Sequence, residues 1–213
     1  DVVLVEQPTY LAAVQAFTEK LARVQRDAES APAGESVCSK QTMAKYVTGD
    51  SRKKVATVDL DVLGTTAKGW AMLTSDPVRK ALDPSGKMDA RAAAVADLRA
   101  SNGPLLVVYK PLEKAWPVVT GTSAKGKDFK YTGGEYTGTL MVYDIDSAAR
   151  LCQTKIAFES SEVVDFKKSR FASEKSSAKE AVEGDFIDRF ETAATDAIKR
   201  AAPDLRLGYK TLE

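Results

Sequence analysis

Histidine is absent from the 213 residues of this chain. Its absence excludes Ser-His-Asp and Cys-His catalytic sets, the usual zinc ligand sets and the commonest general base near neutral pH. Carboxylate and lysine chemistry remain open, but no complete catalytic constellation is present. The sequence therefore favours a protein that is not an enzyme, and it gives no reason to expect a cofactor or a metal ion.

A charge excess and long apolar runs are also missing. The 31 basic and 30 acidic side chains leave a formal net charge of +1, so no sequence-wide field would draw the chain onto nucleic acid or an anionic membrane. The longest apolar stretches, such as 104–109 and 116–119, are far shorter than the ~20 residues that cross a bilayer. We expect no nucleic-acid partner and no transmembrane segment.

Cysteine is scarce, with Cys38 and Cys152 as the two thiols of the chain. Two cysteines in this length fit one structural disulfide in an oxidising compartment or two free buried thiols in a reducing one. We favour the Cys38–Cys152 disulfide and, with it, an exported protein of the periplasm or outer envelope; the alternative is the cytoplasm. The chain begins at Asp1 without the segments of an export signal, which fits a signal that was removed or left out.

Three segments have the apolar spacing or composition of helices. The N-terminal helix is predicted over 8–29, an alanine-rich helix over 88–101 and a C-terminal helix over 177–202. Hydrophobic residues make up 44% of the chain, close to the globular average of ~45–50%, so these helices have a core to cover.

Strands are predicted between the helices. Residues 55–63 alternate polar and apolar side chains up to a glycine, and 105–109 form a short apolar run. Residues 116–120 fit a strand that starts at a proline, whereas 135–145 and 150–166 fit a hairpin.

These elements predict an α+β fold in one domain, 1–213. We expect a mixed, largely antiparallel sheet within 54–166, with amphipathic helices packed on one of its faces, including the long N-terminal and C-terminal helices.

Two segments match sequence motifs of known binding or catalytic sites. Residues 121–128 match a phosphate-binding loop at both glycines and the lysine, but Asp128 replaces the hydroxyl that would bind magnesium. Residues 176–179 have the Ser-x-x-Lys pattern of acylating enzymes without its companion elements. We interpret the first as a basic loop and the second as a chance match.

Two weak binding sites are candidates. Basic residues gather in two predicted loops. There they fit a patch for an acidic partner, a phosphate-bearing lipid head group or a polyanion or, as we favour, a solvated surface. These residues are Lys125, Lys127, Lys130, Lys167, Lys168 and Arg170. An aromatic groove for an apolar or sugar ligand could involve Trp70, Tyr109 and Trp116, although aromatic residues on strands usually belong to the core.

Paired aspartates are the candidates for carboxylate chemistry. Asp59 and Asp61 fall two residues apart in a predicted strand, and Asp144 and Asp146 in a predicted turn, so each pair could bind a divalent ion. We favour plainer interpretations, namely the solvent face of a strand for the first pair and a turn that bonds its own backbone for the second.

The resulting functional hypothesis is a non-catalytic binding or assembly module of the bacterial cell envelope, periplasmic or lipoprotein-like. Its expected partner is a protein or an envelope component. One alternative is a carrier of a small apolar ligand, which requires a cavity lined by residues such as Trp70, Tyr109, Val118 and Phe158. A less favoured one is a carboxylate-based enzyme that uses Asp59, Asp61 or Asp144.

Overall fold

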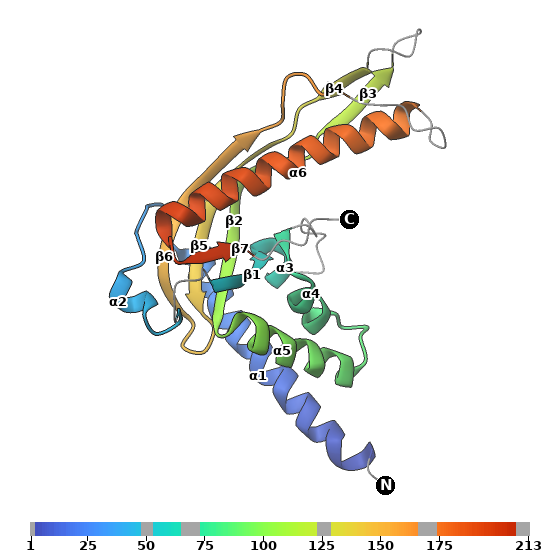
Figure 1. Cartoon of the computed structure of the whole chain (residues 1–213). Helices are drawn as coiled ribbons and strands as arrows, with labels where there is room; N and C mark the ends of the chain where they lie inside the picture. Colours follow the sequence, from blue (N-terminus) through green and yellow to red (C-terminus); the bar gives the residue numbers. More distant parts are fainter. Residues whose placement is uncertain (1–2, 48–52, 65–72, 123–128, 166–173, 208–213) are drawn as a thin grey trace.

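The computed structural model describes residues 3–47, 53–64, 73–122, 129–165 and 174–207 (Figure 1). The helices are α1 (Val3–Ser30), α2 (Lys40–Met43), α3 (Leu60–Gly64), α4 (Asp76–Leu82), α5 (Met88–Asn102) and α6 (Glu174–Ala201). The strands are β1 (Lys53–Asp59), β2 (Leu105–Ala115), β3 (Val118–Thr122), β4 (Phe129–Thr132), β5 (Glu135–Asp144), β6 (Ala149–Glu159) and β7 (Leu205–Leu207). None of these helices is long and apolar enough to cross a membrane.

The central sheet has the strand order β6-β5-β2-β1-β7. β1 is parallel to both β2 and β7, whereas β2 pairs with β5 and β5 with β6 in antiparallel fashion. The predicted mixed sheet, the α+β class and the β5–β6 hairpin are therefore confirmed. β3 and β4 form a separate two-stranded ribbon.

Helices cover both faces of this sheet, and the prediction of a single covered face was wrong. Leu105, Val107 and Tyr109 of β2 belong to a core cluster with α6, whereas Leu106 and Val108 belong to a second cluster with α1 and α5. All five of these side chains are fully buried. A strand that is apolar on both sides needs cover on both sides, so the continuous run of β2 already required two helical layers.

The three predicted helices are confirmed as α1, α5 and α6. α1 and α6 each begin earlier than predicted. α1 buries Val14, Phe17, Leu21, Val24 and Ala28, which lie on one stripe at steps of three and four residues. α5 ends at Asn102. Gly103, which follows it, has a φ of 66° that favours glycine, and the chain then enters β2.

The strand predicted over 55–63 ends earlier, at Asp59. The Asp59 carboxylate accepts a hydrogen bond from the Asp61 backbone N–H at 3.1 Å, so it caps the first turn of α3. This local bond gives the chain a helical continuation that competes with the alternating pattern. Leu60 to Gly64 are therefore helical.

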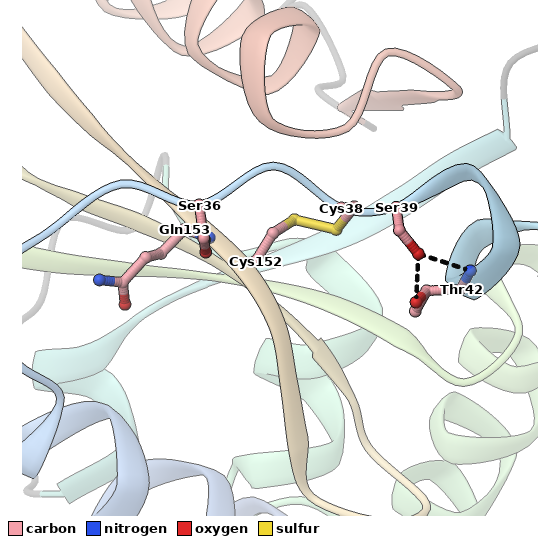
Figure 2. The surroundings of a disulfide bond; sticks show 6 residues. All are labelled: Ser36, Cys38, Ser39, Thr42, Cys152 and Gln153. Atoms are coloured by element: carbon pink, nitrogen blue, oxygen red, sulfur yellow. Dashed lines mark hydrogen bonds between the residues drawn. A yellow bond between two sulfur atoms is a disulfide. The ribbon is translucent and has the colours of Figure 1, made fainter.

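The predicted disulfide between Cys38 and Cys152 is present, with a Cα–Cα distance of 4.9 Å (Figure 2). Beside it, the Ser36 N–H donates to the Gln153 carbonyl at 2.8 Å and the Gln153 N–H to the Ser36 carbonyl at 3.2 Å. Ser39 follows and caps α2 by accepting a hydrogen bond from the Thr42 N–H. The disulfide thus links the segment that follows α1 to strand β6.

Beyond the last β1 partner, at Tyr109, the strands β2, β5 and β6 continue as a three-stranded extension. We call this extension, together with β3, β4 and the N-terminal half of α6, the arm. α6 begins beside the β3–β4 ribbon and runs along the arm to the central sheet, whereas α1 and α5 lie toward the other end of the sheet (Figure 1). Trp116 and Phe186 join the ribbon side of the arm to α6, with ring centroids 5.1 Å apart.

Candidate functional site

The arm has one sheet face that α6 does not cover. The strand register places Glu113, Thr137 and Ala157 in one row across β2, β5 and β6, and Ala115, Glu135 and Glu159 in the next. Of these six side chains Thr137 is half-buried and the others are exposed. We call these six residues, with Glu162, the acidic face.

α1 ends just short of this face. The Lys110 ammonium group donates to the Glu29 carbonyl at 2.8 Å and to the Ala31 carbonyl at 3.3 Å, at the point where the helix stops. Lys110 pairs across the sheet with Thr139, one step along β5 from the acidic face. The helical layer therefore covers the sheet as far as Lys110 and leaves the acidic face open.

A hollow of about 440 Å³ lies on the acidic face and at its β6 border. It is lined by Glu135, Thr137, Ala157, Phe158, Glu159, Ser160, Ser161, Glu162 and Arg189. The hydroxyl oxygen of one lining residue, Thr137, is shielded from solvent and has no hydrogen-bond partner among the described residues. The hollow is an open depression, and three of its four charged lining residues are glutamates.

Like charges oppose each other on the acidic face. Glu135 and Glu159 are direct cross-strand partners, an arrangement that destabilises a sheet when both side chains carry the same charge. Within the described part of the chain, no ion pair involves Glu113, Glu135, Glu159 or Glu162.

Arg189, the cation among the residues that line the hollow, is paired with a residue outside the acidic face. Its Nε lies 2.8 Å from Ser161 Oγ and 3.4 Å from an Asp185 carboxylate oxygen. Burial alone would raise the pKa of Asp185, but the two hydrogen bonds from Ser161 and the charge of Arg189 outweigh it, so this pKa is lowered. Arg189 is thus paired with Asp185, and among the described residues it forms no ion pair with the glutamates of the acidic face.

Two aliphatic side chains border the acidic face. Leu112 is 82% exposed and precedes Glu113, and Val163 is 79% exposed and follows Glu162. Leu112 is the extra residue of a β-bulge, because the register moves from Pro111 opposite Gly138 to Glu113 opposite Thr137. The bulge leaves the Leu112 side chain outside the core.

The same bulge shifts Lys114 onto the α6 side of the sheet, opposite Tyr136. There the Lys114 ammonium group forms an ion pair with Asp61 and lies 3.4 Å from an Asp59 carboxylate oxygen. The Asp59 side chain is fully buried, so the interpretation of this pair as the solvent face of a strand was wrong. The reason is that β1 is an inner strand, lying between β2 and β7 under α6.

The second aspartate pair forms the predicted turn. The Asp146 N–H donates to Asp144 Oδ1 at 2.8 Å, which confirms that the turn bonds its own backbone. Asp144 Oδ2 also accepts a hydrogen bond from the Tyr46 hydroxyl at 2.9 Å, and burial, followed by this carboxylate, raises the pKa of Tyr46 to about 12. Asp146 pairs with Lys20 and Arg99.

The candidate carboxylates therefore all have partners within the fold. Nowhere among the described residues do three or more acidic or other metal-binding side chains gather closely enough to hold one metal ion. Lys114 neutralises charge between Asp59 and Asp61, and Asp144 secures a turn, so these groups stabilise local structure.

The aromatic residues of the proposed groove pack against α6. Tyr109 is fully buried, with its ring centroid 5.3 Å from that of Phe190. Trp116 donates its indole N–H to Glu183 at 2.9 Å. Phe158 packs against Tyr136 and Phe190. Val118 is 55% exposed on the ribbon, and Trp70 lies outside the described residues.

The basic loops can be placed only at Lys130, which is exposed on β4. Lys125, Lys127, Lys167, Lys168 and Arg170 lie outside the described residues.

The acidic face was missed by the sequence reasoning because its glutamates are far apart in the chain. A signal did exist. Glu113, Glu135 and Glu159 each occupy a polar position near the end of a predicted or extended strand, and the antiparallel pairing of those strand ends brings them together.

Comparisons with protein-family models, with curated proteins and with solved structures found no match, so the function has to be argued from the residues of this chain.

Proposed function

We propose that this chain is a non-catalytic binding or assembly module of the bacterial cell envelope, and that it binds a protein or an envelope component through the acidic face of the arm. The observation that carries the proposal is the cross-strand pair Glu135 and Glu159 on a sheet face that no described helix covers.

Exposure by itself would not single out this face, because antiparallel sheets often have one solvated side. The distinguishing feature is the sign of its charges. A purely solvated face gains by mixing Lys with Glu across strands, whereas here two carboxylates oppose each other. Residues that lower the stability of the fold and make no compensating structural contact are typical of functional surfaces.

The disulfide supports the compartment part of the proposal. Both cysteines are buried and the bond joins segments 114 residues apart in the sequence. Disulfides that link distant parts of a fold persist in oxidising compartments such as the periplasm and are rare in the cytosol.

The two alternatives gain less support. An enzyme built on Asp59, Asp61 or Asp144 would need two carboxylates of unequal pKa in a cleft, whereas Asp59 and Asp61 share the ammonium group of Lys114. A carrier would need a cavity beside Tyr109 and Phe158, but both rings pack directly against Phe190.

Site-specific photo-crosslinking in the organism that encodes the chain tests the binding surface. A crosslinking residue at Ala157, on the acidic face, is expected to give a discrete adduct with a partner. The same residue at Ala93, which is exposed on α5, is the matched control and should give none.

The adduct at Ala157 should disappear when Glu135 and Glu159 are both replaced by lysine, because this change inverts the charge at both positions. Equal crosslinking at Ala157 and Ala93, none at Ala157, or an adduct that survives the charge inversion would each contradict the proposed function.

A further inference from the structure

We infer that the partner of the acidic face is an extended polypeptide segment rich in lysine or arginine. This inference rests on the proposed function and adds the chemistry of the partner. Its basis is the distribution of charge, the size of the side chains between the charges and the hydrogen bonds already made at the neighbouring strand edge.

The carboxylates of this face are spread over a surface. Glu113 comes from β2, Glu135 from β5, Glu159 from β6 and Glu162 from the segment after β6. They are not among any group of three or more ligands that could hold one metal ion in the described residues. Dispersed negative charge complements a row of separate cationic side chains better than it does a single ion.

The positions between the glutamates carry small side chains. Ala115, Thr137 and Ala157 leave room for a main chain to approach the sheet. The exposed side chains of Leu112 and Val163 lie at the two borders. Lys and Arg have apolar stems below their charged groups, so they can contact such borders while their cations face the glutamates. A small polyamine or a metal ion would make little use of these aliphatic borders.

The segment is expected to lie across the face and not to add a strand at the β6 edge. Within the described residues, main-chain groups of Lys155 and Glu159 on that edge already have hydrogen-bond partners. Glu35 accepts a hydrogen bond from the Lys155 N–H at 3.2 Å, Arg200 donates to the Lys155 carbonyl at 3.2 Å and Arg189 to the Glu159 carbonyl at 3.5 Å. Strand addition needs these main-chain groups to be free.

The test uses a short fluorescent peptide with arginine at alternate positions, and the same peptide with citrulline, its neutral isostere. Fluorescence anisotropy is expected to detect binding of the arginine peptide to the disulfide-bonded protein, weakening as salt is raised. The triple variant Glu135→Gln, Glu159→Gln, Glu162→Gln should weaken this binding roughly 10-fold or more, because it removes most of the opposing charge.

The matched control is the triple variant Glu19→Gln, Asp97→Asn, Glu180→Gln. It removes the same net charge from exposed positions on α1, α5 and α6 and should change the affinity by less than about 2-fold. An equal loss in both triple variants would mean general attraction to an acidic protein and would overturn the inference. Citrulline peptide binding as tightly as the arginine peptide would do the same, as would spermine or Ca²⁺ competing at the concentration of the peptide.

Failure of this inference can be told apart from failure of the proposed function. A partner that crosslinks at Ala157 through a segment lacking Lys and Arg, together with no arginine-peptide binding, would overturn the basic-segment inference alone. An absent adduct at Ala157 contradicts the proposed function whatever the peptide does.

Discussion

The two ends of the β5–β6 hairpin differ in whether their acidic side chains form ion pairs. At the turn end, Asp146 lies between two cations from different helices, 2.6 Å from Lys20 of α1 and 2.6 Å from Arg99 of α5. At the arm end, Glu135 faces Glu159, and neither has an ion-pair partner among the described residues. The same pair of strands thus joins a neutralised end to an end that is left acidic.

The difference separates what stabilises the fold from what is available for binding. The hydrogen bonds from Arg99 and then Lys20 lower the pKa of Asp146, so its charged form stabilises the folded chain. Both cations come from helices that cover the sheet. The arm end lacks such helices on its open face, and its charges remain free to meet a partner of opposite sign.

The largest effect is expected in the covered part of the hairpin, where Cys152 joins β6 to Cys38. Replacing both cysteines by serine removes a crosslink between residues 114 apart in the sequence. The chain-entropy model predicts a loss of about 4–5 kcal/mol in the free energy of unfolding. Urea unfolding without reductant measures it, and reduction of the unmodified protein is the control. An unfolding free energy equal to that of the parent would show that the disulfide constrains little.

A smaller loss is expected when the neutralised end is broken by Asp146→Asn. Because Asp146 is partly exposed, the two ion pairs together should contribute only about 1 kcal/mol. The folded-state pKa of Asp146 is lowered, so this stability is full above the ordinary Asp pKa of about 4 and is lost as the pH falls through the folded-state value. The difference between parent and variant in urea unfolding should therefore be constant near neutrality and shrink in acid.

The matched control for this change is Asp196→Asn, which removes an exposed ion pair with Lys199 within α6. It should alter the unfolding free energy by no more than about 0.5 kcal/mol. A loss as large as that of Asp146→Asn would mean that tying two helices to the hairpin adds nothing.

The turn and the disulfide at the covered end of the hairpin could be predicted from the sequence, but the ion pairs there could not. The turn at Asp144 and Asp146 was predictable, because Asx residues bond their own backbone over two residues. The partners Lys20 and Arg99 were not, since they lie 126 and 47 residues away and depend on helix packing. The pairing of the two cysteines was predicted because the chain offers no other pair.

The arm shows why the candidate site could not be predicted from the sequence. Periodicity identified the strands that form it, but the rows of residues across a sheet depend on register, and one bulge at Leu112 decides which side Glu113 and Lys114 occupy. The helix after Asp59 was missed for a similar reason. The alternating pattern predicts a strand through residues 60–63, but the Asp59 side chain caps a helix there. Local pattern predicts elements well, whereas register and capping require the pairing partner.

The smallest effect has the opposite sign and tests the comparison most directly. Glu159→Lys replaces the repulsion opposite Glu135 with an attraction, so the unfolding free energy should rise by about 0.2–1 kcal/mol, while arginine-peptide binding falls. Glu159→Gln removes only the repulsion and should give part of the gain. Glu135→Lys combined with Glu159→Lys restores opposition of like charges and should cancel it. Urea unfolding at low salt measures all three. If Glu159→Lys binds the peptide less and is also less stable, the lost binding comes from a damaged fold. Greater stability with weaker binding is the result expected if the repulsion between Glu135 and Glu159 serves binding of a cationic partner.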